Sequence, residues 1–203
     1  MKKTRTILAS SSPRRLELLK LINIDPVVLE PDIDENIMNT ESVHEFVKRV
    51  SIEKGNNIFN SSLNNDLIIS ADTVVVTDNK IIGKPEDRKD AENILEDLSG
   101  IEHTVITGIA LKYDNKVLYD HSSTRVIFKQ LTKNEIEAYL NTEDYMDKAG
   151  GYAIQGRASI FIQEIHGCFF NVMGFPLNLF YEMLKKIGVS LKELEMIEEV
   201  NSR

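Results

Sequence analysis

Three serines and two arginines lie together near the start of the chain, in a pattern suited to binding an anion. The segment reads Leu8-Ala9-Ser10-Ser11-Ser12-Pro13-Arg14-Arg15. Ser12 is a favourable helix N-cap and Pro13 fits the first helical position, so a strand is expected to pass into a helix here. The positive end of that helix and two forked guanidinium groups suit phosphate oxygens. Cations are disfavoured in a first helical turn, which favours an external anion over the alternative of solvated arginines.

A carboxylate interrupts an apolar run in the segment Ser70-Ala71-Asp72-Thr73. The β-branched residues on both sides predict a core strand, in which an unpaired carboxylate would be costly. Two interpretations stay open for Asp72. It faces solvent or accepts backbone N–H bonds at a bend, or it is a ligand for a hard divalent cation or the base that positions a water molecule.

Oxygen ligands near Asp72 would favour magnesium over zinc. Asp34 and Glu35 lie in a segment that its prolines hold out of helix, and they can supply further carboxylate oxygen. Mg²⁺ is typically shared between one or two carboxylates and substrate phosphates. Cys168 is the only cysteine, which excludes an internal disulfide and a cysteine-rich metal site. The histidines show no paired ligand spacing and are expected at surface or turn positions: His44, His103, His121 and His166.

Several lysines are further candidates, each with a plainer alternative. Lys84 lies in Gly83-Lys84-Pro85, where the backbone is expected to be extended and exposed. Lys54 falls near the end of a predicted helix, and Asp147-Lys148 precede the glycine-rich residues 149–156. A solvated surface lysine is the default for each. The glycines can simply form a turn, although glycine also lets a backbone approach a ligand closely.

Length and composition favour one soluble domain over residues 1–203, with 42% hydrophobic residues. No apolar run reaches membrane-spanning length and the first residues lack the apolar core of a signal peptide, so a cytoplasmic protein without membrane partners is expected. The net charge of -8 argues against general nucleic-acid binding. The acidic residues 191–203 are expected to form a peripheral helix or a frayed tail.

The order of the expected elements predicts an α/β fold with a mixed, strongly twisted sheet flanked by helices. Helices are expected at residues 13–22, 40–59, 90–98, 133–140 and 176–187. The fourth of these helices has the plainest start, a capping box of Thr132 and Glu135. Strands are expected near residues 7–8, 67–76, 80–83, 103–112, 116–129 and 159–165, with 168–173 following a turn at His166-Gly167.

In this order the segments resemble the Maf family of nucleoside triphosphate pyrophosphatases, from about residue 5 to residue 187. The matching segments are residues 8–15, Asp34-Glu35, Lys54, residues 70–75, residues 83–85 and residues 147–156. The resemblance implies an elongated, two-lobed, inosine-triphosphatase-like fold with a cleft, commonly as a homodimer. It also implies cleavage of nucleoside triphosphates to the monophosphate and pyrophosphate with a divalent cation, Mg²⁺ or Mn²⁺. One departure is visible, because the family often has Glu-Pro where this chain has Asp144-Tyr145.

The resemblance further implies roles for single residues. Asp72 matches the family's proton acceptor, while Arg14, Thr73 and Gln155 match positions linked to base choice. Their combination is similar to that of the branch acting on dTTP and UTP. The amide of Gln155 offers one donor and one acceptor, which match the imide N–H and the adjacent carbonyl shared by uracil and thymine.

The resulting hypothesis is that water, oriented by Asp72 and a divalent cation, attacks the α-phosphorus while pyrophosphate leaves. Cationic side chains would neutralise the charge that grows on the phosphate oxygens. The catalytic residues are then Asp72, Lys54 and Lys84, with Asp72, Glu35 and Asp34 as metal ligands. The substrate-binding residues are Ser10, Arg14, Arg15, Thr73, Gln155, Asp147 and Lys148.

Two alternatives remain. The first is a pyrophosphatase whose main substrate is a modified pyrimidine nucleotide. The second is a nucleotide-binding regulator of septum formation and cell division, since binding residues alone do not separate binding from hydrolysis. A binding module has little need for a metal-ready carboxylate beside cations, which favours hydrolysis.

Overall fold

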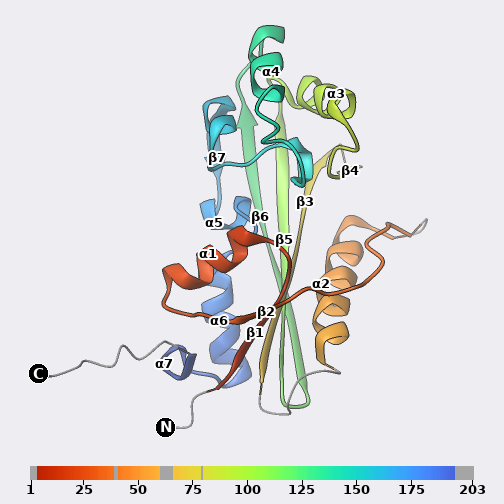
Figure 1. Ribbon diagram of the computed structural model, residues 1–203. Helices are drawn as coiled ribbons and strands as arrows, with labels where there is room; N and C mark the ends of the chain where they lie inside the picture. The colour runs from red at the N-terminus through yellow and green to blue at the C-terminus, as the bar shows by residue number, and fades with distance from the viewer. Residues whose placement is uncertain (1–3, 39–40, 60–65, 79, 195–203) are drawn as a thin grey trace, which may run out of the picture.

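A computed structural model describes residues 4–38, 41–59, 66–78 and 80–194 of the chain. Within these residues seven strands form one mixed sheet in the order β2-β1-β3-β5-β6-β7, with β4 paired to β3 (Figure 1). β1 runs parallel to β2 and β3, whereas the other pairs are antiparallel. The predicted mixed α/β fold is confirmed. The strands are β1 (Thr6–Ala9), β2 (Val27–Leu29), β3 (Leu67–Thr77), β4 (Lys80–Ile82), β5 (Glu102–Tyr113), β6 (Lys116–Phe128) and β7 (Ile162–His166).

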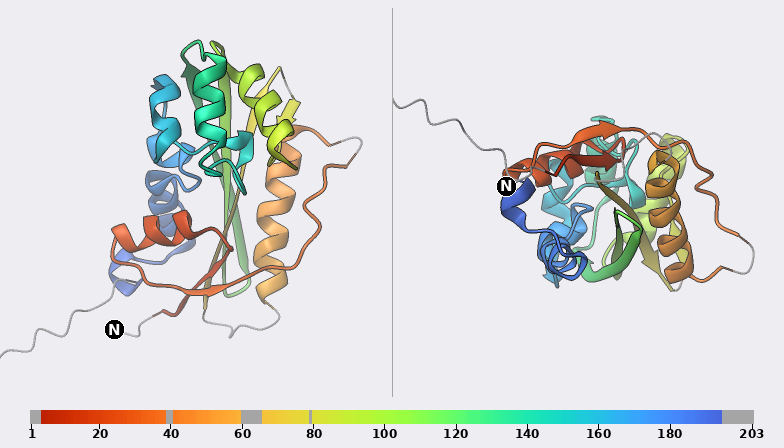
Figure 2. Two further views of the ribbon diagram at one scale, coloured as in Figure 1. Left: turned by 45° about the horizontal axis from the view of Figure 1, so that its top comes forward. Right: turned by 90° about the horizontal axis from the view of Figure 1, so that it is seen from below.

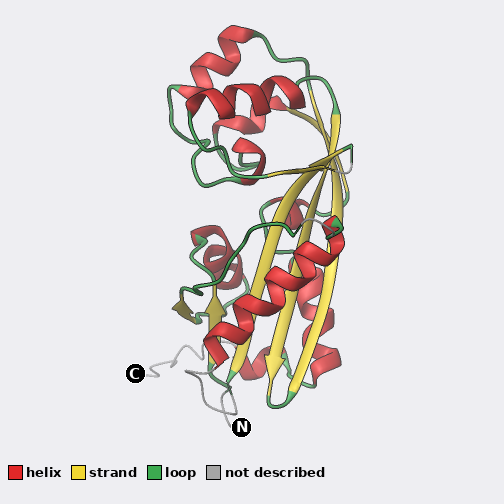
Figure 3. Cartoon of the chain, turned by 90° about the vertical axis from the view of Figure 1, so that its right-hand side faces the viewer, coloured by secondary structure: helices red, strands yellow, loops and turns green. Residues whose placement is uncertain are grey.

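Helices gather in two groups, one toward each end of the long strands β3, β5 and β6, so that the molecule is elongated (Figures 1 and 3). The group at one end has α2 (Val43–Phe59) on one face of the sheet, and α1 (Pro13–Leu21) with α6 (Leu177–Ile187) on the other (Figure 2). The group at the other end has α3 (Arg88–Leu98) and α4 (Lys133–Leu140). Short turns of helix complete the fold: Ala149–Gly151, Arg157–Phe161, α5 (Phe169–Val172) and α7 (Leu191–Leu194).

Strand β3 packs against helices on both faces of the sheet. Successive side chains of a strand point to opposite faces. Leu67, Ile69 and Ala71 therefore pack with α1 and α6, while Val74 packs under α2. The same alternation places Asp72 on the α2 face and Thr73 on the α1 face.

Three expected boundaries shift for local reasons. Helix α2 begins at Val43 because Ser42 and Glu45 form a reciprocal cap, with each backbone N–H donating to the other side chain. Its predicted start, Thr40, lies outside the described residues. The strand expected from residue 159 begins at Ile162, after the helical turn Arg157–Phe161. Residues 168–173 contain the helix α5. The Thr132–Glu135 capping box is confirmed.

His103 corrects the expectation that each histidine lies at the surface or in a turn. Its side chain on β5 is 2% exposed, and its Nε2 lies 2.6 Å from the hydroxyl of Tyr152. The ring also meets Phe128 edge to face. This position faces the apolar cluster around α3 and α4, so burial lowers the pKa of His103 to about 4.

The free energy of unfolding is expected to fall as the pH drops from 6.5 towards 4. Unfolded His103 takes up a proton near its ordinary pKa of 6.5, whereas the folded residue stays neutral until about 4. The unfolded state therefore binds more protons in this window, which costs at most about 3 kcal/mol of stability. Urea unfolding at pH 7 and pH 4.5 measures the difference. His103→Phe should reduce this difference between the two pH values, whereas replacement of the exposed His166 by Phe should not. An equal pH dependence of stability in both variants would refute the assignment to His103.

Candidate active site

A cleft of about 1030 Å³ lies between the two groups of helices, beside the middle of β3. β1 pairs with β3 only as far as Ala9 and Ser70, and β4 begins its pairing at Val75. Among the described residues no strand covers this edge of β3 at residues 71–74. The gap opens both faces of β3 to one space, so Asp72 and Thr73 line the same cleft despite their opposite directions.

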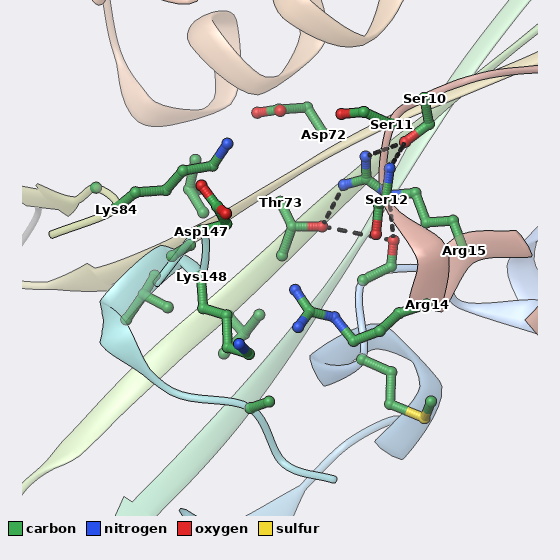
Figure 4. A pocket seen from close by; sticks show the side chains of 18 of the residues that line it. Ser10, Ser11, Ser12, Arg14, Arg15, Asp72, Thr73, Lys84, Asp147 and Lys148 are labelled. Atoms are coloured by element: carbon green, nitrogen blue, oxygen red, sulfur yellow. Dashed lines mark hydrogen bonds between the residues drawn. The ribbon is translucent and has the colours of Figure 1, made fainter. Parts of the chain in front are cut away.

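Arg15 is the most unusual residue of the cleft, because it is only 8% exposed and its guanidinium forms no ion pair with a described carboxylate. Its Nε donates to the carbonyl of Gly174 at 3.0 Å. Its Nη1 donates to Ser10 Oγ at 3.1 Å and its Nη2 to Thr73 Oγ1 at 3.0 Å (Figure 4). These neutral acceptors take three of the five N–H donors of a guanidinium. A buried cation with donors to spare is prepared for an anion.

The start of α1 adds to this positive character. Ser12 occupies the N-cap position, as expected, but its side chain caps no backbone N–H, and no acidic residue lies in the first turn. Ser10 Oγ instead accepts the N–H of Ser12 at 3.2 Å. The residues of this turn line the cleft with their helix end uncapped by side chains. The arrangement fits the anion site that the sequence predicts.

Three cations from two segments of the chain, Arg14 and Arg15 of α1 and Lys148 before the glycine-rich loop, crowd this space (Figure 4). Burial lowers the pKa of Arg15 from its ordinary value, which Asp72 opposes and Arg14 reinforces. Burial likewise lowers the pKa of Arg14. The pKa of Lys148 is lowered by burial first and by the charge of Arg14 second. A bound polyanion would relieve these unfavourable effects together.

On the α2 face, Lys54 pairs with two of the carboxylates that line the cleft. Its Nζ lies 2.8 Å from Asp72 Oδ1 and 3.0 Å from Glu35 Oε1. Both Lys54 and Asp72 are 6% exposed. The default of a solvated surface lysine is therefore wrong for Lys54. Asp72 is compensated by this ammonium, and not by solvent exposure or backbone N–H groups among the described residues.

The glycine-rich loop forms the opposite wall and is tied to the segment of Lys84. The N–H of Gly150 donates to the carbonyl of Gly83 at 2.9 Å. Gly150 has a φ of 70°, and a Cβ there would lie 2.9 Å from Val75, so only glycine fits. The hydroxyl of Tyr139 donates to the carbonyl of Gly151 at 3.2 Å. Lys84, Lys148 and Gln155 thereby face the cleft.

The departure at Asp144-Tyr145 leaves this wall anchored. The side chain of Tyr145 is buried in the apolar cluster of α3 and α4. Asp144 is held through its backbone N–H, which donates to Thr142 Oγ1 at 3.2 Å, and its carboxylate lies 3.9 Å from Arg157. An apolar core contact at Tyr145 therefore fixes the segment before Asp147.

The structure brings all but one of the predicted site residues together. Asp34 does not line the cleft; its exposed carboxylate accepts the N–H of Asn36 at 2.9 Å in a local turn. In the described part of the chain no group of three or more His, Cys, Asp or Glu side chains is placed to hold a metal ion. The predicted residues that line the cleft are Ser10, Arg14, Arg15, Glu35, Lys54, Asp72, Thr73, Lys84, Asp147, Lys148 and Gln155.

Sequence reasoning missed the support behind Arg15. Gly174 supplies a carbonyl to Arg15, and its φ of 103° favours glycine. Thr107 on β5 and Asn171 on α5 are fully buried and hydrogen bonded beneath Thr73. A glycine shortly before the helix-starting Pro176 is the one local signal that points to Gly174, while Thr107 and Asn171 carry none.

Comparisons with known proteins show the family of the chain. The family model described as Maf-like protein matches residues 5–187. A dTTP/UTP pyrophosphatase of Clostridium botulinum strain Okra is 44% identical over 190 residues, which cover 91% of this chain and 98% of the relative. A protein of the same name from Clostridioides difficile is 43% identical, over 89% of this chain and 93% of the relative. Another from Thermosipho africanus is 44% identical, over 91% of this chain and 94% of the relative.

Solved structures give more distant likenesses. The Ham1 protein of Staphylococcus aureus is 16% identical with a TM-score of 0.43, covering 62% of this chain and 72% of that one. A nucleoside-triphosphatase described as dITP/XTP pyrophosphatase from Mycobacterium abscessus is 12% identical with a TM-score of 0.41, covering 63% and 76%.

Proposed function

Because the chain belongs to the Maf-like protein family, we propose that its cleft hydrolyses dTTP and UTP to the nucleoside monophosphate and pyrophosphate. One observation carries the proposal: buried Arg15, which forms no ion pair with a described carboxylate, shares a cleft with Asp72, a buried carboxylate at an open strand edge. The first feature suits a phosphate chain and the second suits a water molecule. The named relatives support the choice of dTTP and UTP.

The phosphates bind, in this proposal, between the α1 end and the glycine-rich wall. Ser10, Arg14 and Arg15 lie on the α1 side of the site, while Lys84 and Lys148 extend into it from facing segments (Figure 4). These cations stabilise the negative charge that moves to the leaving pyrophosphate, where placement matters more than any covalent step. Asp147 precedes Lys148 with a φ of 57°, a backbone turn that directs both side chains to the cleft.

The donor set beside Lys54 fits a divalent cation. Asp72 and Glu35 already point one oxygen each at a single cationic atom, the Nζ of Lys54. Two carboxylates are what Mg²⁺ typically takes from a protein when substrate phosphates complete its ligands. Mg²⁺ or Mn²⁺ held there would draw charge from the phosphate oxygens. We assign Asp72 the further task of orienting the attacking water and accepting its proton.

Lys54→Met is expected to change metal binding and catalysis in opposite directions. The carboxylates of Asp72 and Glu35 would lose the ammonium that neutralises them, so Mn²⁺ should bind more tightly in the absence of nucleotide. The kcat/KM for dTTP should nevertheless fall about 100-fold, since a cation of the reacting centre is lost. Electron paramagnetic resonance of free Mn²⁺ reports the binding. Lys186→Met, which removes an exposed lysine paired with Asp120, is the control; weaker Mn²⁺ binding by Lys54→Met than by this control would count against the assignment.

We assign base choice to Gln155, whose side chain lines the cleft. Its side chain is exposed there and free to offer its amide to an imide edge. A cytosine ring presents a different pattern of donors and acceptors. Apolar side chains that line the cleft, among them Phe46 and Ile81, offer a surface for a pyrimidine ring.

A panel of nucleoside triphosphates scored by pyrophosphate release tests the function. We expect the largest kcat/KM for dTTP and UTP, with CTP well below both. A strong preference for a modified pyrimidine triphosphate would replace the proposed substrate. Nucleotide binding without pyrophosphate release, with Mg²⁺ or Mn²⁺ present, would favour the regulator of septum formation.

The wider expectations are proposals of the same kind. We propose that residues 1–203 act as one domain, because β3, β5 and β6 run through both groups of helices and neither group has a sheet of its own. No helix among the described residues has the length and apolar character needed to cross a membrane. The cytoplasmic location, the homodimer and the lack of nucleic-acid partners stay predictions.

A further inference from the structure

We propose that Thr107 is a positioning residue that aims Arg15 at the phosphates by fixing the hydroxyl of Thr73. The inference rests on the proposed function, because it takes Arg15 to be a phosphate ligand. Thr107 is 0% exposed and does not line the cleft. Any effect on substrate must therefore pass through another residue.

The geometry follows from the register of the sheet. Thr107 on β5 is the direct partner of Thr73 on β3, so both side chains lie on the same face. Their hydroxyl oxygens are 3.0 Å apart. Thr73 Oγ1 is in turn 3.0 Å from Arg15 Nη2. A short path of hydrogen bonds thus joins a buried position of β5 to the guanidinium.

The direction of each bond can be worked out from the far end of the path. The carbonyl of Asn171 can only accept, so Thr107, at 3.0 Å, donates its single hydroxyl proton to it. The oxygen of Thr107 is then left to accept the proton of Thr73. Thr73 has a second acceptor in the Gly174 carbonyl, but that contact is longer, at 3.5 Å. With its proton committed to Thr107, Thr73 presents lone pairs to Arg15.

The far end of the path is held firmly. Asn171 is 0% exposed, and its side-chain amide donates to the carbonyl of Val105 and to Thr124 Oγ1, both at 2.9 Å. Thr124 Oγ1 also accepts the N–H of Cys168 at 3.0 Å. Helix α5 is thereby fixed to β5 and β6. The acceptor for Thr107 is a positioned backbone group rather than exchangeable solvent.

Removing the hydroxyl of Thr107 would release the proton of Thr73. The acceptor that remains is the Gly174 carbonyl, at 3.5 Å, so the Thr73 hydroxyl would turn from its fixed orientation and no longer hold Nη2 of Arg15 in place. We expect Thr107→Val to weaken the binding of inorganic tripolyphosphate about tenfold, the usual effect of one lost hydrogen bond to a charged group. Thr107→Ser keeps the hydroxyl and should bind within about twofold of wild type.

A double-mutant cycle separates positioning from general damage to the fold. Tripolyphosphate binding is measured by calorimetry, without metal, for the wild type, Thr107→Val, Arg15→Met and the double variant. If Thr107 acts through Arg15, Thr107→Val should have no further effect in the Arg15→Met background. An equal loss in both backgrounds, or an equal loss in Thr107→Ser, would overturn the inference.

The same experiment distinguishes failure of the proposed role of Thr107 from failure of the proposed pyrophosphatase activity. Tripolyphosphate binding requires neither a base nor turnover. A protein that shows the expected cycle but releases no pyrophosphate from dTTP would disprove the pyrophosphatase and leave Thr107 in its role. Normal dTTP hydrolysis with unchanged tripolyphosphate binding in Thr107→Val would disprove only the role of Thr107.

Discussion

Replacing Asp72 by asparagine is expected to lower the kcat for dTTP by about 1000-fold or more, because the side chain loses both its charge and its ability to accept a proton. Asparagine has the same shape, so the fold of β3 should persist. Lys54 would retain Glu35 as its partner at 3.0 Å, which limits the cost of the missing charge. The measurement is pyrophosphate release at saturating dTTP and Mg²⁺, with the unfolding temperature recorded in parallel.

Asp120→Asn supplies the matched control. Asp120 lies on β6 outside the cleft and pairs with Lys186 at 3.4 Å. Its replacement removes the same charge from the protein and should leave kcat within about twofold, as an exposed ion pair contributes little. A folded Asp72→Asn protein that keeps a tenth or more of the wild-type kcat would show that Asp72 is not the group that activates water.

Arg15→Met is expected to cost about 100-fold in tripolyphosphate affinity and about 1000-fold in kcat/KM for dTTP, since two charge-assisted hydrogen bonds are lost. The free energy of unfolding without anion should stay level or rise. The guanidinium is buried without a described carboxylate partner, so methionine removes a desolvated charge. A variant that gains stability while losing its ligand would identify Arg15 as a residue kept for binding.

The control for this prediction is Arg125→Met. Arg125 is exposed on β6, and its Nη1 lies 3.3 Å from Glu102 outside the cleft. The substitution Arg125→Met removes one positive charge without changing a residue of the cleft, so the affinity for tripolyphosphate should be unchanged. Equal losses of affinity in Arg15→Met and Arg125→Met would mean that net charge, rather than the Arg15 contact, attracts the anion.

Local signals in the sequence predicted the elements that carry the site. Ser12 and Pro13 placed the start of α1, and the β-branched run around Asp72 placed β3, because capping geometry and strand preference depend on nearby residues. The Thr132–Glu135 capping box was equally plain. The resemblance joined these separate segments into one expected cleft.

Partners across the sheet could not be predicted in the same way. Lys54 meets Asp72 only because α2 packs on one face of β3, and Thr107 meets Thr73 only through the register of β5. The open edge at residues 71–74 depends on where β1 ends and β4 begins. No local pattern records these distances.

Asp34 and Glu35 show most clearly what the sequence alone does not predict. Neighbouring residues of an extended segment point to opposite sides, so one of the pair was bound to turn away from Lys54. Which one does so depends on how the segment crosses α2. Glu35 reaches Lys54, while Asp34 closes a turn with Asn36.

In the proposed reaction, water attacks the α-phosphorus of a triphosphate held in this cleft. Hydrolysis of dTTP in H₂¹⁸O, followed by mass spectrometry of the products, tests it most directly. The predicted result is one ¹⁸O atom in dTMP and none in pyrophosphate. Label in pyrophosphate, or release of dTDP and labelled orthophosphate, would place the attack at another phosphorus and contradict the account.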